Sequence, residues 1–222
     1  MKRHLAPDVQ GVLLAAGQGC RWRSAGGVGS KLLHRLPDGT PLAVAAARSL
    51  LAALPGSLAV VRPSDLVLAQ ILRETGLRIV WAREDPPRLG RSLAAAVRAT
   101  EGADAWLVAL ADMPWVRRST HAAVAEALRA GHELVAPTFA GHRGHPVGFG
   151  RVHGPALAAL HADTGARDLV RREAGRLRRL ACDDPGVLLD VDEPAPDGQS
   201  LRDAAGRSTA VGEAGEGAVH GR

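Results

Sequence analysis

The chain has 222 residues, of which 46% are hydrophobic and only 3% aromatic, with no tyrosine. This length suits one well-buried domain, or at most two small ones, with a core built from Ala, Leu and Val. The formal net charge is +5, but the basic residues are spread along the sequence. Scattered charge and scarce aromatic rings argue against a nucleic-acid-binding protein, which remains a minor alternative.

The two cysteines, Cys20 and Cys182, provide neither a disulfide framework nor a paired-cysteine metal site, so a reducing compartment is expected. Residues 1–8 contain no apolar signal core. No segment reaches the roughly 18 uninterrupted apolar residues of a membrane span. The sequence therefore predicts a cytoplasmic protein with no membrane partner.

Predicted strands and helices alternate along the chain. We expect strands at 9–14, 58–61, 77–81, 105–111, 133–137, 144–149, 177–181 and 187–191, and helices at 41–54, 64–74, 92–100 and 119–130. Ser64 and Ser92 are expected to cap the helices that they begin. Apolar strands followed by helices indicate an α/β fold with a mostly parallel sheet covered on both faces. From Ala204 the periodicity ends, which predicts one domain over 1–203 and a disordered tail over 204–222.

A glycine-rich loop follows the first predicted strand and contains Gly17, Gly19, Arg21 and Lys31. Of the 28 basic residues 26 are arginine, so a lysine in this loop either has a function or is a chance survivor. Glycines let backbone N–H groups approach phosphates, and the two cations offset phosphate charge. The loop matches neither the P-loop nor the dinucleotide fingerprint. It nevertheless predicts a triphosphate-binding site.

Three aspartates provide candidate metal ligands. Asp112 follows the strand at 105–111, and Asp190 and Asp192 would point to one side of the strand predicted at 187–191. Carboxylates suit Mg²⁺, although such residues also occur as caps and in solvated turns. Because ligands bind at the carboxyl ends of parallel strands, we expect Gly17, Asp112 and Asp192 at one edge of the sheet.

Six motifs occur in an order that resembles the molybdenum cofactor cytidylyltransferases, within the wider MobA-like nucleotidyltransferase family. They lie at 14–33 (LAAGxGxR, then KLL), 89–93 (LGRSL), 110–114 (LADMP), 141–149 (GHRGHPVGF), 163–167 (DTGAR) and 188–194 (LLDVDEP). The resemblance implies a Rossmann-like fold of the nucleotide-diphospho-sugar transferase type. It also implies Mg²⁺-dependent transfer of a nucleotide to a pterin phosphate, with release of pyrophosphate. Within the family, the Ala15-Ala16-Gly17 version of the loop goes with CTP rather than GTP.

The resemblance also assigns the candidate site residues. Arg21, Lys31 and Asp112 are the expected catalytic residues, and Asp112 and Asp192, helped by Asp190, would bind the metal. The expected nucleotide-binding residues are Leu14, Ala15, Ala16, Gly17, Gly19, Arg21, Lys31, Ser92 and Asp112. The expected acceptor-binding residues are Gly144, His145, Pro146 and Arg167. Each of Ser92, His145 and Arg167 also has a structural alternative, as a helix cap or as a packed polar residue.

Two segments depart from the family pattern. Arg21 and Lys31 are ten positions apart, farther than in the family, and the segment that follows Asp192 lacks the usual Asp-Thr-Pro-Glu-Asp sequence. These departures leave two alternatives open. One is a nucleotidyltransferase for another phosphorylated acceptor, such as a sugar or polyol phosphate. The other is a non-catalytic nucleotide-binding factor that matures a molybdoenzyme by acting on its apo-protein.

Overall fold

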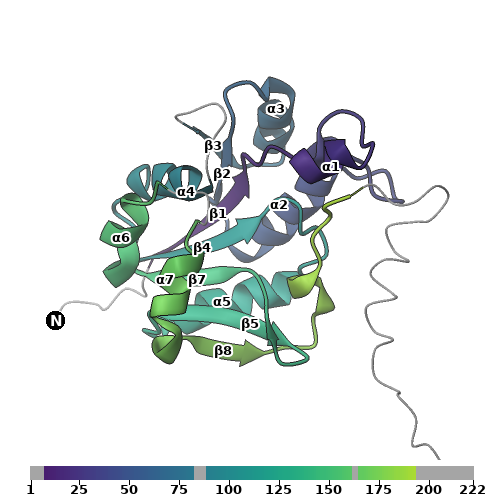
Figure 1. Cartoon of the computed structure of the whole chain (residues 1–222). Helices are drawn as coiled ribbons and strands as arrows, with labels where there is room; N and C mark the ends of the chain where they lie inside the picture. Colours follow the sequence, from purple (N-terminus) through teal and green to yellow (C-terminus); the bar gives the residue numbers. More distant parts are fainter. Residues whose placement is uncertain (1–7, 83–88, 162–164, 194–222) are drawn as a thin grey trace, which may run out of the picture.

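The computed structural model describes residues 8–82, 89–161 and 165–193 (Figure 1). The predicted tail at 204–222 lies outside these residues, and the domain assignment stays a prediction. None of the described helices is both long enough and apolar enough to cross a membrane.

The described strands form one sheet in the order β3-β2-β1-β4-β7-β5-β6, with β8 paired to β5. Its strands are β1 (Val9–Ala15), β2 (Leu58–Val61), β3 (Arg78–Trp81), β4 (Ala105–Leu110), β5 (Leu134–Phe139), β6 (His142–Arg143), β7 (Val147–Gly150) and β8 (Arg178–Ala181). β1 pairs in parallel with both β2 and β4. Because β7 is antiparallel to both β4 and β5, the sheet is mixed rather than wholly parallel.

Helices cover both faces of this sheet, as predicted. The α-helices are α1 (Cys20–Ser24), α2 (Leu42–Ala53), α3 (Leu66–Glu74), α4 (Leu89–Arg98), α5 (Arg118–Arg129), α6 (Gly154–Ala158) and α7 (Arg167–Arg172). One core cluster joins α2, α3 and α5 to one face, where Leu13 and Val135 point. The second joins α4, α6 and α7 to the other face, where Val12 and Ala136 point, and both layers are visible in Figure 1.

The last predicted strand is absent. Pro185–Leu188 forms a 3₁₀ helix, η4, and Leu189 to Asp192 have no regular structure. Proline has no N–H to donate to a ladder, and the side chain of Asp184 accepts a hydrogen bond from Gly186 N at 3.0 Å, which closes a turn there. The segment therefore crosses the edge of the sheet instead of joining it.

Both predicted serine caps are wrong. Helix α3 begins after Asp65, which makes no side-chain capping bond, so Ser64 lies outside the helix. Ser92 lies inside α4, with only 2% of its surface exposed.

The 3₁₀ turn at Lys31–Leu33 forms η1, and further 3₁₀ turns lie at Arg151–His153 (η2) and Ala174–Arg176 (η3).

Candidate active site

The glycine-rich loop leaves β1 and turns directly into α1. Gly19 stands at the start of this helix with φ of 61°, a left-handed conformation that glycine adopts without steric cost. Gly17 is exposed, whereas the side chain of Ala15 belongs to the core on the α2 face. The loop therefore presents the backbone of Gly17 and Gly19 at the carboxyl end of β1.

The long segment between Arg21 and Lys31 is anchored by a buried tryptophan. Trp22 is 2% exposed and packs against Leu42 and Val191. Gly27 fits against its ring, because a Cβ at that position would lie 2.2 Å from Trp22 Nε1. The residues between Arg21 and Lys31 thus fold back on α1, and η1 places Lys31 beside the glycine-rich loop.

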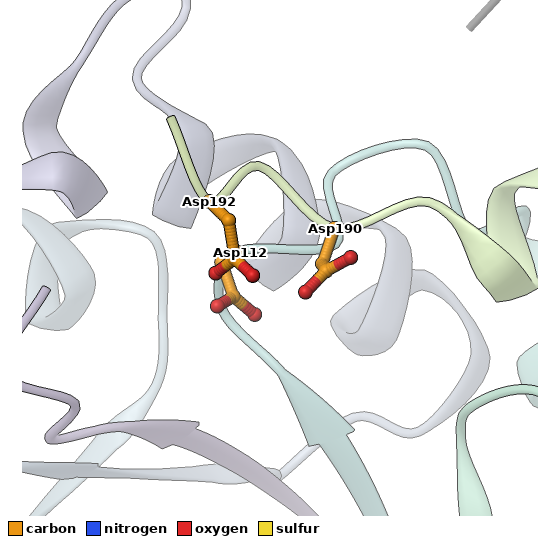
Figure 2. Close-up of side chains that lie close together, drawn as sticks. All are labelled: Asp112, Asp190 and Asp192. Atoms are coloured by element: carbon orange, nitrogen blue, oxygen red, sulfur yellow. The ribbon is translucent and has the colours of Figure 1, made fainter. Parts of the chain in front are cut away.

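Asp112, Asp190 and Asp192 form an acidic cluster at the carboxyl end of β4. One carboxylate oxygen from each residue lies within 4.8 Å of the others. Figure 2 shows their carboxylates facing a common space. The backbone holds this arrangement, since Val191 N donates to Asp112 O at 3.0 Å. Three such oxygen ligands suit a divalent cation such as Mg²⁺.

Two loop cations pair with this acidic cluster. Lys31 Nζ lies 2.7 Å from Asp112 Oδ2 and 3.3 Å from Asp192 Oδ1. Arg21 forms an ion pair with the other oxygen of Asp192. The Lys31 side chain is only 11% exposed, whereas that of Arg21 is 75% exposed. The structure therefore joins the predicted phosphate-binding cations to the predicted metal ligands.

Within the acidic cluster, the surroundings of Asp190 disfavour its ionised form. Partial burial, followed by the nearby carboxylates of Asp192 and Asp112, raises its pKa above the ordinary value. A divalent cation among the three carboxylates would offset this repulsion.

A pocket of about 370 Å³ opens between the glycine-rich loop and the acidic cluster. Its lining includes seven of the nine predicted nucleotide-binding residues: Leu14, Ala16, Gly17, Gly19, Lys31, Ser92 and Asp112. Ala15 and Arg21 are not part of the lining. Such a size and mixed lining suit a small-molecule ligand.

Arg62 and Asp65 also line this pocket, and the sequence analysis missed them. Arg62 Nε donates to Asp65 Oδ2 at 2.8 Å, and its terminal NH2 nitrogen donates to Oδ1 at 2.9 Å, which fixes the guanidinium. Arg62 directly follows β2, so the rule that ligands bind beyond strand ends would have found it.

A second pocket, of about 170 Å³, shares Leu14, Leu89 and Leu110 with the first. Arg143, His145 and Arg167 contribute polar groups to its otherwise apolar lining. Two predicted acceptor residues, His145 and Arg167, are thus brought together, while Gly144 and Pro146 are not part of the lining.

Gly144 has a structural role instead. A Cβ there would lie 2.3 Å from Val187 O, so glycine lets η4 pack against this strand edge. The following His145 N donates to the same Val187 O at 2.9 Å.

His145–Pro146 is a cis peptide bond. Burial, together with Arg143, lowers the pKa of His145 to about 4, so its ring is neutral at neutral pH.

A buried aspartate ties the segment that carries Asp190 and Asp192 to α5. Asp184 is 1% exposed, and its Oδ2 accepts from Arg117 N at 2.8 Å and from Thr120 Oγ1 at 2.6 Å. These donors lie at the start of α5, where backbone N–H groups lack helical partners. The bonds fix one end of the segment, and Val191 N fixes the other.

Comparison with known proteins identifies the family. The model of the MobA-like NTP transferase domain matches residues 11–179. The chain belongs to this family. It is therefore a nucleotidyltransferase with a Rossmann-like fold, as the motifs predicted. A comparison with curated proteins gives no significant match.

Solved structures of other proteins share the architecture. Rv0371c from Mycobacterium tuberculosis H37Rv is 26% identical, with a TM-score of 0.68 over 85% of this chain and 94% of that one. A nucleotidyl transferase from Methanothermobacter thermautotroptrophicus is 23% identical, with a TM-score of 0.70 over 90% and 99% of the two chains. This likeness shows the fold alone. Rv0371c has also been solved as a complex with manganese.

Proposed function

We propose that this nucleotidyltransferase transfers CMP from CTP to the phosphate of molybdopterin or its molybdenum form, with release of pyrophosphate. The observation that supports this most directly is the meeting of Lys31 with Asp112 and Asp192 beside the 370 Å³ pocket. A triphosphate needs both a metal and cationic side chains. This site offers carboxylate ligands for the metal, and Lys31 as a cation for the phosphates. In cells, we expect the reaction in the cytoplasm.

Mg²⁺ is the proposed cofactor, and the acidic cluster fits it, because the three oxygens lie within 4.8 Å of one another. Asp112 and Asp192 would hold the ion, with Asp190 as a third ligand. When bound, Mg²⁺ neutralises phosphate charge and polarises the phosphorus that is attacked. The manganese complex of Rv0371c supports a divalent cation in a related protein.

The reaction requires alignment rather than a strong base. An acceptor phosphate with a second pKa of about 6 is already ionised near neutral pH. One of its oxygens would form a bond to the α-phosphorus of CTP, while the bond from that phosphorus to the β-phosphate oxygen breaks. Lys31 and Arg21 would turn from the aspartates to the triphosphate and stabilise the departing pyrophosphate.

The bound nucleotide would lie along the glycine-rich loop. Backbone N–H groups near Gly17 and Gly19 would contact the β- and γ-phosphates, and Ser92 lies in the same pocket lining. Cytidine is proposed from the Ala15-Ala16-Gly17 pattern, with Ala16 in the pocket lining and Ala15 in the core on the α2 face.

The acceptor would occupy the second pocket, which adjoins the first through Leu14 and Leu110. Its apolar floor and its two arginines, Arg143 and Arg167, suit a flat ring system with anionic groups. The same features also suit another phosphorylated acceptor, the second candidate. A non-catalytic maturation factor for a molybdoenzyme is the third, and the complete set of Lys31, Asp112 and Asp192 argues against it.

Calorimetric titration of the protein with CTP and GTP in the presence of Mg²⁺ tests the nucleotide assignment. We expect CTP to bind at least tenfold more tightly than GTP, and Ala16→Gly to narrow this ratio. Ala25→Gly, in the same segment but outside the pocket lining, should leave the ratio unchanged. Equal binding of the two nucleotides by the unmodified protein would contradict the assignment.

A further inference from the structure

Three arginines from different elements lie on one side of the sheet. Thr138 of β5 pairs with Arg143 on one edge and with Ala181 of β8 on the other. Arg179 pairs with Ala136, two positions before Thr138 on β5. Since residues at i and i+2 of a strand face the same side, Arg143 and Arg179 share the face of Ala136.

That face is the one covered by α7. Ala136 packs in the core cluster with Leu169 and Val170 of α7. Arg167 is the first residue of α7 and lines the second pocket together with Arg143. Arg143 and Arg167 thus line the proposed acceptor pocket, and Arg179 lies on the same face of the sheet, near enough for its charge to act on Arg143.

These arginines lack an acidic counterpart among the residues that the structure describes. Within 8–82, 89–161 and 165–193, no carboxylate forms an ion pair with Arg143, Arg167 or Arg179. Partial burial, then the charges of Arg167 and Arg179, lowers the pKa of Arg143 from its ordinary value. Three like charges close together are unfavourable, and an anion among them would relieve the repulsion.

The position of Arg179 separates this group from the acidic cluster. In the sheet order, β8 lies three strands from β4, through β7 and β5, which is roughly 14 Å in the plane of the sheet. Asp112 follows the end of β4. Arg179 therefore extends from a strand well away from Asp112, which favours a separate anion for this group over the phosphate held beside Asp112.

We propose that Arg143, Arg167 and Arg179 bind a second anionic group of the acceptor, an oxyanion or a thiolate, distinct from the phosphate that attacks CTP. This inference rests on the proposed function and deepens it. The acceptor would then be anionic at two ends, with its apolar middle over Val147, Phe149 and Val170 in the second pocket. Arg167 would bind this second group rather than the attacking phosphate.

Selenate serves as the probe, titrated calorimetrically at constant ionic strength into protein saturated with CTP and Mg²⁺. We expect one selenate site, weakened at least tenfold by Arg143→Gln and by Arg179→Gln. Arg178→Gln is the matched control, because Arg178 neighbours Arg179 on β8 but pairs with Val135 and faces the other side. All three substituted positions are exposed, and circular dichroism verifies that each variant is folded.

Binding of molybdopterin, measured without turnover, connects this site to the acceptor. Selenate should weaken molybdopterin binding to the unmodified protein, and both cluster variants should bind molybdopterin at least tenfold more weakly. Selenate binding that is the same in all three variants would overturn the proposal, as would selenate binding with no effect on molybdopterin. Absence of pyrophosphate release with these binding results intact would instead contradict the proposed function.

Discussion

The ammonium group of Lys31 lies 2.7 Å from Oδ2 of Asp112, in a position where it neutralises a proposed metal ligand. It also lies 3.3 Å from Oδ1 of Asp192. The same carboxylates cannot fully serve both this ammonium and a divalent cation. Binding of the metal and rotation of Lys31 toward the triphosphate are therefore expected to occur together, so that each favours the other.

Replacement of Lys31 should separate these two effects. In Lys31→Ala, a divalent cation without nucleotide should bind about tenfold more tightly, equivalent to about 1.4 kcal/mol, because a competing charge is gone. Binding of CTP should become weaker, because its phosphates lose a cation. Electron paramagnetic resonance of Mn²⁺ measures the first and calorimetry the second. Unchanged Mn²⁺ affinity would refute the competition.

Asp112→Asn should remove activity while leaving the fold intact. Loss of a charged group that stabilises the reacting phosphates should reduce kcat at least about 100-fold. Asp104→Asn, just before the other end of β4, is the matched control and should retain activity. Both variants are compared by pyrophosphate release and by thermal unfolding. A folded Asp112→Asn protein with normal activity would exclude Asp112 as a metal ligand.

Asp184→Asn should reduce both stability and metal affinity. The buried carboxylate accepts three hydrogen bonds, from Arg117 N, Thr120 Oγ1 and Gly186 N, and the amide of Asn would place its NH2 group against at least one of these donors. We expect the free energy of unfolding to fall by about 3 kcal/mol. Mn²⁺ should also bind more weakly, since the segment with Asp190 and Asp192 loses hydrogen bonds that hold it to α5.

The adjacent Asp183, whose side chain is 96% exposed, is the control for Asp184. Asp183→Asn should change neither urea unfolding nor Mn²⁺ affinity. If Asp184→Asn lost stability but kept wild-type Mn²⁺ affinity, Asp184 would have no role in positioning the acidic cluster.

Stability should fall as the pH is lowered from 7 to 5. Burial lowers the pKa of His121 to about 4 from 6.5, so the unfolded chain binds a proton in this range that the folded protein does not. The contribution is present above the unfolded pKa and is lost as the pH falls toward 4. For His121 alone the loss is about 2 kcal/mol at pH 5.

Urea unfolding at the two pH values measures this dependence. In His121→Gln the free energy of unfolding should change less with pH, because glutamine does not titrate. The part of the pH dependence that comes from other groups should remain. A variant with the same pH dependence as the unmodified protein would contradict the assignment to His121.

The sequence predicted the layered fold because apolar strands and helices have distinct local patterns. It also brought Asp112, Asp190 and Asp192 together, but for a wrong reason, and their role as metal ligands stays a prediction. Asp190 and Asp192 lie in an irregular segment that follows η4, and the bond from Val191 N to Asp112 O holds this segment beside Asp112. They do not alternate along a strand. Tertiary contacts overrode the apolar run at 187–191.

The arginine group was beyond the reach of the sequence. Arg143 and Arg179 are 36 positions apart and share a face only because β6 and β8 pair with opposite edges of β5. Strand register of this kind depends on long-range pairing, which local patterns do not encode. By contrast, Arg62 directly follows a predicted strand. The rule that ligands bind beyond the carboxyl ends of strands could have predicted it from the sequence.

The most direct test of the central claim is pyrophosphate release by the purified protein with Mg²⁺ and molybdopterin, comparing CTP, GTP, ATP and UTP. We predict release with CTP that depends on both Mg²⁺ and molybdopterin, and little with the other three nucleotides. No release with any nucleotide, from protein that still binds CTP, would contradict the proposed transfer.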